Sequence, residues 1–163
     1  MRRLTFTNNR GESIEFYLSP FLIESLEGIG EVEAELQEQV APYRDGSIHI
    51  DAILRPRFIE LEGSITNIKL KEIRKKRQEL SRVCNPKLGL GKITLELDGS
   101  IKEIHGVTEG SVVFPERERN PFQPFMITWK CPDPYWKDLQ EVSRDLKAYE
   151  GKFTFPFQFP VQF

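Results

Sequence analysis

The sequence predicts a mainly β fold: a β-sandwich with one α-helix laid against it and one β-hairpin that projects from it. Three observations support this prediction. Short runs of alternating apolar and polar residues, separated by turns rich in Gly, Pro and Asp, occupy most of the chain. Residues 67–84 form the one convincing helical pattern. Residues 31–54 form a hairpin pattern whose first strand is laden with glutamates.

Composition bounds the class of protein. The chain has 163 residues, 39% of them hydrophobic and 29% charged, which is typical of one soluble globular domain. No apolar run approaches the roughly 20 residues of a membrane span. Two cysteines so far apart, Cys84 and Cys131, do not make a disulfide framework or a metal cluster. We therefore expect free thiols in a protein made in a reducing cytoplasm.

The N-terminal elements follow from turn chemistry. Residues 4–6 and 13–17 predict a short hairpin, because residues 8–11 (Asn-Asn-Arg-Gly) tolerate positive φ. Residues 20–30 fit either a short helix or an irregular strand, and their glycines disfavour a long helix.

The next segment, residues 31–54, predicts a large hairpin. Its tip is a turn at residues 42–46, and its return strand alternates apolar with polar residues, as in a strand covered on one face. Residues 55–57 (Arg-Pro-Arg) interrupt the pattern, since proline lacks a ladder donor, and a second β run follows over residues 58–65. Because its first strand is acidic and its tip polar, we expect residues 31–54 to project as an arm.

Helical spacing dominates residues 67–84. Asn67 is a candidate N-cap, and Asn85-Pro86 ends the pattern. Arg77 falls within the apolar stripe, where it either extends its head to water or pairs with a glutamate. The apolar members of the stripe are Leu70, Ile73, Leu80 and Cys84.

A second hairpin is predicted over residues 92–97 and 100–107, with Asp98-Gly99 at its turn. The apolar residues of its return strand break strict alternation, so we expect a bulge near Glu103.

The remaining segments predict strands at residues 111–114 and 122–130, and an aromatic corner at residues 132–136. A weakly amphipathic helix is compatible with residues 135–149. In residues 153–163 every odd position is apolar and both prolines occupy even positions, which predicts an edge strand.

Residue types that serve catalysis are present but scattered. His49 and His105 lack metal-ligand spacing, and we expect both to face solvent. Cys84 and Cys131 are expected to be packed, and Asp133 to be a turn residue that bonds local backbone. We therefore expect no enzyme activity, no catalytic residue, no metal and no cofactor.

Charge is distributed unevenly along the chain, although the net charge is only −2. Residues 11–43 contain eight glutamates and no lysine or arginine, whereas residues 69–84 contain seven cations against two glutamates. Two solvated faces would explain the blocks, and so would complementary patches on neighbouring subunits. We disfavour a nucleic-acid site, because the chain is acidic overall and carries no recognisable binding motif.

Four motifs, taken in order, carry a family resemblance. They are PYRDGSIHID (42–51), LRPRFIELEGSI (54–65), NPKLGLG (85–91) and CPDPYW (131–136). Together they resemble the N-terminal domain of the distal tail protein of long-tailed siphophages, in the siphovirus tail component family. The resemblance covers nearly the whole chain.

The resemblance implies a structural protein of a phage or prophage tail tip, not an enzyme. It would form a homohexameric ring, a baseplate hub that meets the tail tube on one face and fibre, lysin or receptor-binding proteins on the other. The genome would pass through the channel without sequence-specific contact, no membrane would be involved, and synthesis would occur in the host cytoplasm. The candidate interface residues are Glu31, Glu33, Glu35, Glu38, Arg44, Asp45, His49, Arg74, Lys75 and Arg77.

The resemblance also implies a domain division. Residues 1–150 would form the ring domain, and residues 151–163 would begin a linker or edge strand toward the second β domain of longer members. A chain that stops at Phe163 would be a truncated or short member. The alternative interpretation is a free-standing β-sandwich that binds carbohydrate or peptide with its aromatic residues.

Overall fold

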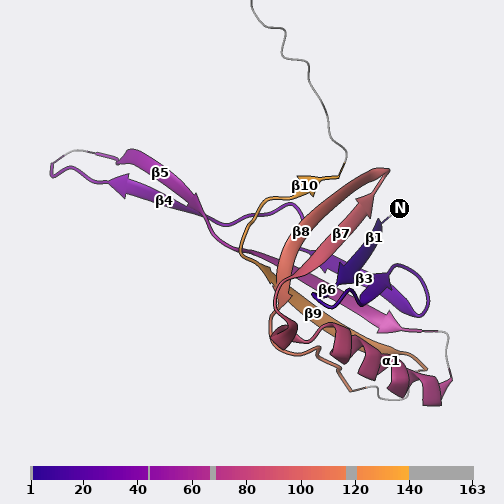
Figure 1. The fold of residues 1–163 in the computed structure, drawn as a ribbon. Coiled ribbons are helices and arrows are strands. Elements are labelled where there is room, and N and C mark those ends of the chain that lie inside the picture. The colour runs from indigo at the N-terminus through magenta and orange to yellow at the C-terminus, as the bar shows by residue number, and fades with distance from the viewer. Residues whose placement is uncertain (1, 44, 67–68, 117–120, 140–163) are drawn as a thin grey trace, which may run out of the picture.

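The structure is a computed structural model, and it describes residues 2–43, 45–66, 69–116 and 121–139 (Figure 1). Its strands are β1 (Arg2–Thr7), β2 (Ser13–Phe16), β3 (Phe21–Glu27), β4 (Ala34–Gln39), β5 (Ile48–Leu54), β6 (Arg57–Ile65), β7 (Gly91–Leu97), β8 (Ser100–Thr108), β9 (Gln123–Cys131) and β10 (Lys137–Asp138). Its helices are α1 (Leu70–Val83) and a single 3₁₀ turn, η1 (Pro86–Leu88). The prediction of a mainly β fold with one α-helix is confirmed.

The body is one antiparallel sheet that folds back on itself. Its strand order is β2-β1-β7-β8-β9-β6-β3, with β10 added beside β8. Most of β8 pairs with β7, but its last two residues, Val107 and Thr108, pair with β9. This change of partner divides the sheet into two layers, and a bridge between Tyr17 and Leu22 brings the terminal strands β2 and β3 together. The two layers enclose the core.

Aromatic rings fill the space between the layers. Phe6 and Phe16 lie 5.5 and 6.1 Å from the Trp129 ring, and Phe125 lies 5.8 Å from Phe16, measured between ring centroids. All four side chains are almost fully buried. Tilted and edge contacts at these separations add to the stabilisation from burial alone.

Helix α1 closes one end of the sandwich. Ile73, Leu80 and Cys84 are buried as predicted, which confirms the apolar stripe at these three positions. The predicted start was wrong: Lys69, with extended backbone and no side-chain cap, is the N-cap residue, and Asn67 lies outside the described residues. An amide contact from Asn8 Nδ2 to the Val83 carbonyl, 3.4 Å long, joins the end of α1 to the first hairpin.

The β7–β8 hairpin turns as predicted, with Asp98 and Gly99 at φ 48° and 85°. The predicted bulge near Glu103 is wrong, because the pairing runs without a shift from Gly91 opposite Gly106 to Leu97 opposite Ser100. Alternation is kept by placing Ile104 in the core and Ile101 on the outer face.

Several other segments adopt a secondary structure that differs from the one their sequence pattern predicts. Residues 20–30 contain strand β3, with a bulge between Ile23 and Ser25. The predicted strand over residues 111–114 reduces to a single bridge between Val113 and Met126. The helix proposed for residues 135–149 is wrong at its start, which forms β10, and its later part lies outside the described residues, as does the predicted edge strand at 153–163.

The β4–β5 hairpin forms a sheet of its own and extends away from the body (Figure 1), so the predicted arm is confirmed. A hydrogen bond of 2.8 Å from the Arg55 amide to the Glu33 carbonyl closes its base. We use "arm" for residues 33–55.

Arg57 fixes the base of the arm to the body. Its side chain is buried and donates to four main-chain carbonyls: Nη1 to Gly28, Ile29 and Glu31 at 2.7, 2.7 and 2.9 Å, and Nε to Pro134 at 2.9 Å. Burial lowers the pKa of the guanidinium from its ordinary value, and the nearby Cys131 acts in the opposite sense. Hydrogen bonds from a charged donor are stronger than neutral ones, so this cluster joins three chain segments.

We predict that Arg57→Met lowers the free energy of unfolding by about 3 kcal/mol, because buried carbonyls lose a charged donor. The expected fall in melting temperature is about 6–12 °C for a domain of this size. The control is Arg55→Met, whose exposed ion pair with Glu35 is worth at most about 1 kcal/mol. Equal losses in the two variants, measured by thermal unfolding, would contradict the assignment.

Gly28 supports the same junction, with φ at 74° and no room for a side chain. A Cβ atom there would lie 1.8 Å from the Phe58 carbonyl oxygen. We predict that Gly28→Ala destabilises the protein by at least about 2 kcal/mol more than Gly110→Ala, which shares the positive φ but has open space. Chemical denaturation of both variants measures the difference, and a difference near zero would show that the junction can move aside.

Candidate subunit interface

The arm exposes apolar side chains on both of its faces. Cross-strand partners share a face, so Ile53 opposite Glu35 and Ile48 opposite Gln39 lie on one face, and Leu36 opposite Ala52 lies on the other. The predicted half-covered strand is therefore wrong, since the part of the chain that the structure describes covers neither face. The exposed large apolar residues of the arm are Leu36, Val40, Tyr43, Ile48, Ile50 and Ile53.

Acidic side chains are interspersed among these apolar residues. Glu35 pairs with Arg55 at 3.0 Å, and Glu38 accepts a hydrogen bond of 2.6 Å from Ser47. Asp45 is exposed near the tip, and His49 is exposed on β5, as predicted for a solvent-facing histidine. Glu31 and Glu33 precede β4 at the base of the arm, and Arg44 lies outside the described residues. The arm therefore combines apolar surface with negative charge.

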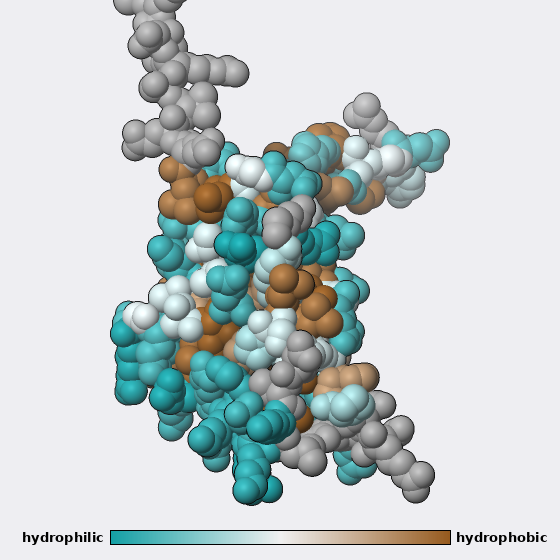
Figure 2. Space-filling view, turned by 90° about the vertical axis from the view of Figure 1, so that its right-hand side faces the viewer, coloured by the Kyte–Doolittle hydropathy of each residue, from teal (hydrophilic) through white to brown (hydrophobic). Residues whose placement is uncertain are grey.

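The basic residues of α1 lie far from the arm. Arg74, Lys75 and Arg77 are exposed on the helix. Figure 1 shows the arm leaving one end of the body and α1 lying across the opposite end. In Figure 2 the α1 end, at the bottom, is mostly hydrophilic, whereas hydrophobic atoms are spread along the arm. The structure thus separates the carboxylates of the arm from the basic residues of α1, while Glu12, in the first hairpin of the body, pairs with Arg82 at 3.3 Å.

Arg77 has a partner that the sequence did not predict. Its side chain is exposed, as in the first of the two predicted alternatives, and its guanidinium lies over the Phe114 ring, 4.6 Å from the centroid. Phe114 is half-buried against the core in the segment after β8. A cation held over an aromatic face keeps its donors available to another acceptor.

A groove runs between α1 and residues 111–116. One hollow of about 420 Å³ is lined by Ile73, Arg74, Arg77 and Phe114 with Pro115, Glu116 and Gln123. A neighbouring hollow of about 760 Å³ shares Arg74, Arg77 and Phe114 and continues to Arg82 and Ser111. The Gln123 amide shapes the first hollow by donating to the Pro115 and Pro124 carbonyls, each at 2.9 Å. We call these two hollows the basic groove.

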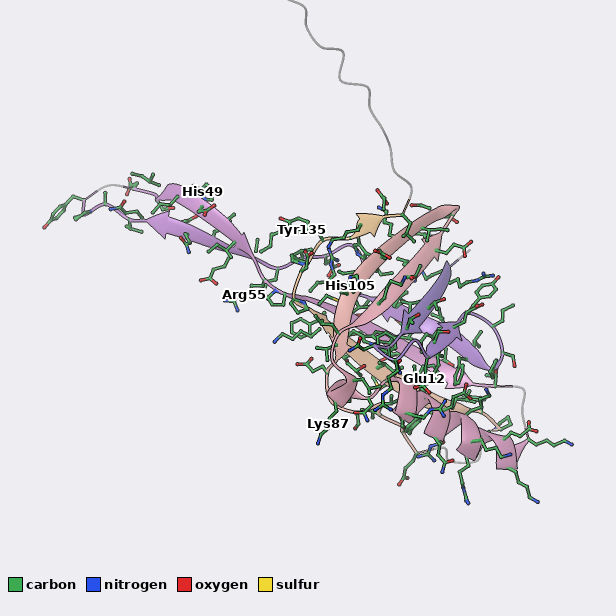
Figure 3. The ribbon with its side chains drawn as sticks, in the orientation of Figure 1. Glu12, His49, Arg55, Lys87, His105 and Tyr135 are labelled. Carbon is green, nitrogen blue, oxygen red and sulfur yellow. The ribbon has the colours of Figure 1, made fainter. Side chains whose placement is uncertain are left out.

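Side chains with catalytic chemistry do not converge in the described part of the chain. Asp133 Oδ1 accepts a 3.2 Å hydrogen bond from the Tyr135 amide, as predicted for a turn residue. His105 and His49 lie far apart in Figure 3. No group of three or more His, Cys, Asp or Glu residues with metal-binding geometry occurs among residues whose positions are described.

Two features of the candidate interface were not predicted from the sequence. The buried role of Arg57 was hidden in an Arg-Pro-Arg run that indicated only an interruption of the strand. The groove depends on Phe114 meeting a helix more than thirty residues away, for which local periodicity gives no signal. The apolar residues of the arm were visible, but their alternation did not tell which chain would cover them.

The chain was compared with protein families, with curated proteins and with solved structures, and the first and third comparisons gave matches. The family described as the phage tail protein RIFT-related domain matches residues 9–131, more than half of the chain. No curated protein matches the sequence. Among the described residues, no helix has the length and apolar character needed to cross a membrane.

Solved structures share the fold at low identity. The SPP1 Dit protein (gp 19.1), described as a paradigm of the hub adsorption apparatus in phages that infect Gram-positive bacteria, matches with a TM-score of 0.61 and 16% identity, over 82% of this chain and 51% of that chain. The phage p2 baseplate in its activated conformation with Ca matches with a TM-score of 0.66 and 8% identity, over 80% and 44%. This chain therefore spans about half the length of the chains it matches.

The two thiols are free and buried, as predicted. Burial raises the pKa of Cys84 to about 12 and that of Cys131 to about 11, the latter partly offset by Arg57. We predict little alkylation of the folded protein near pH 8 and rapid labelling in denaturing urea, read by mass spectrometry. Above the ordinary thiol pKa of 9.0, the unfolded chain loses protons that the folded chain keeps, so stability should fall as pH rises. Fast labelling of the folded protein would contradict this burial.

Proposed function

Because the chain belongs to the phage tail protein family defined by the RIFT-related domain, we propose that it is a ring-forming structural subunit at the tip of a phage tail. The family match confirms the resemblance to siphophage tail components that the four motifs carry. In the proposed ring, each subunit lays its arm on the next subunit. The expected ring is a hexamer, as the resemblance implies.

The observation that supports this proposal most directly is the uncovered arm. Its two strands hydrogen-bond only to each other among the described residues, and six large apolar side chains are exposed on the arm, four of them on the strands. An isolated two-stranded hairpin is marginally stable in water, and exposed apolar patches mark interaction sites. Cover from another chain would bury these side chains.

The position of the arm favours a head-to-tail contact. The arm and α1 lie at opposite ends of the body (Figure 1), so a contact between one arm and the far end of another subunit joins two different surfaces. Contacts of that kind close into rings when the rotation between subunits permits it. We propose that Glu31, Glu33, Glu35, Glu38, Arg44, Asp45 and His49 form the arm side of the contact, and that Arg74, Lys75 and Arg77 form the helix side.

The remaining roles extend from the same proposal. The ring would lie at the virion tail tip, joined to the tail tube on one face and to baseplate, fibre, lysin or receptor-binding proteins on the other. The genome would pass through the channel without sequence-specific contact. Subunits would be made in the cytoplasm of the bacterial host.

Excision of the arm tests the function. The Glu33–Arg55 hydrogen bond offers a natural junction, so residues 34–54 can be replaced by Asn-Gly, a dipeptide suited to a tight hairpin turn. We predict that the intact chain has the light-scattering mass of an oligomer and that the shortened chain is a monomer. Retention of the core is checked by its thermal unfolding. An intact chain that remains monomeric at high concentration and low salt would overturn the ring.

Salt gives a second measure of the contact. The arm is acidic and α1 basic, so part of their attraction acts between exposed charges that salt screens over about 10 Å at 0.1 M. We predict that the oligomer mass at a fixed protein concentration falls as the salt concentration rises. Sucrose at matched viscosity serves as the control, and a mass that grows with salt would show that apolar burial alone drives assembly.

A further inference from the structure

We propose that the basic groove of one subunit receives the distal half of the arm of a neighbouring copy, residues 38–48. This inference rests on the proposed function and adds the receiving surface. The groove has an apolar floor and cationic walls, and the distal arm has apolar side chains between carboxylates. The occupant is therefore a second copy of this chain.

Two of the cations in the walls of the groove, Arg74 and Arg77, have no acidic partner in the part of the chain that the structure describes. Among the described residues, no carboxylate lies within ion-pair distance of Arg74 or Arg77. Arg82 does pair with Glu12, at 3.3 Å, and closes the far end of the groove. The Phe114 ring holds the Arg77 guanidinium in place. Glu116 also lines the first hollow, so a carboxylate that enters the groove meets the two arginines on the α1 side and one acidic residue opposite them.

The apolar floor of the groove complements the apolar side chains of the distal arm. Phe114 and Val112 present apolar surface between the cations, over hollows of about 420 and 760 Å³. The distal arm offers Val40, Tyr43 and Ile48, all exposed, and Tyr43 is held at φ 60° at the tip. Aromatic and arginine side chains are the residues that most often dominate binding at interfaces.

Charge supports the same pairing at the scale of whole segments. Residues 31–54 contain six carboxylates against one arginine, and residues 69–84 have seven cations against two. Among the carboxylates of the arm, Glu38 and Asp45 lie nearest the tip, because Glu38 pairs beyond Gln37 and Asp51 and Asp45 belongs to the turn. Opposite patches at opposite ends of one subunit also disfavour arm-to-arm and helix-to-helix association.

A charge exchange tests the pairing in the full-length chain. Arg74→Glu/Arg77→Glu and Glu38→Lys/Asp45→Lys are each expected to weaken assembly at least about 100-fold in the dissociation constant, and the four changes together to restore it to within about tenfold. The control is Lys71→Glu/Lys87→Glu, which makes the same charge change at exposed positions outside the groove and should leave assembly unchanged. Thermal unfolding shows whether each variant keeps its fold.

Cross-linking tests the location independently. Val40→Cys and Ser111→Cys are prepared as separate chains and mixed, so that a disulfide between them joins two different subunits. We expect this mixed dimer to exceed the one formed by Val40→Cys with Ser100→Cys, because Ser100 lines a separate apolar hollow beside Trp136. A preference for position 100 would overturn the groove assignment.

The outcomes separate this inference from the proposed function. If the oligomer persists in both charge-reversed double variants, the groove assignment is wrong and the proposed ring stands. The same holds if combining the four changes does not restore assembly. A chain that is monomeric under every condition overturns both. If the intact chain binds a labelled DNA duplex and Arg74→Glu/Arg77→Glu abolishes that binding without changing the oligomer, the groove is a nucleic-acid site and the inference is wrong.

Discussion

The structure depends on one buried cation. Arg57 opens β6, yet its side chain reaches back to the segment before the arm and across to the corner after β9, where it bonds four carbonyls. Trp136 reinforces the junction by donating from Nε1 to the Ile29 carbonyl at 3.0 Å. An arm without packing contacts of its own would otherwise pivot freely at its base. The buried guanidinium gives it a fixed direction, and a fixed direction lowers the entropy lost when the arm binds.

The body serves as the rigid frame between two surfaces. The aromatic core holds both layers of the bent sheet, and α1 is packed against that core by Leu80, Val83 and Cys84. Gly28 and Gly63 allow backbone and ring to approach where a Cβ would lie 1.8 Å from Phe58 and 2.3 Å from Leu22 carbonyl oxygens. These contacts set the arm and the basic groove at opposite ends of one unit. A repeating assembly needs that separation to be the same in every copy.

The sequence predicted those secondary-structure elements correctly that are determined by interactions between residues close in the chain. The Asp98-Gly99 turn, the strand after Arg-Pro-Arg and the stripe of α1 follow from φ preference, alternation and helical spacing, all of which are short-range. The errors fall where long-range packing decides. Ile101 breaks the apolar alternation because it lies on the outer face, and the β3 bulge adjusts that strand to β6. The helix start moved to Lys69 although that residue offers no capping side chain.

The charged residues of the candidate subunit interface could be predicted from the sequence, but the groove that they line could not. Blocks of glutamate and of lysine and arginine are visible in sequence because each lies on one continuous segment, whereas the groove joins α1 to a segment that follows β8. The arm illustrates a deeper limit. Alternation of apolar and polar residues records that one face of a strand is covered, but it does not record whether the cover belongs to the same chain. Apolar and polar residues alternate over residues 48–52, but the bulge between His49 and Asp51 places Ile48 and Ala52 on opposite faces, and the described body leaves both faces open. Apolar side chains that alternate on a strand left open by the described body are therefore the reason why we propose a partner surface for the arm of this phage tail protein.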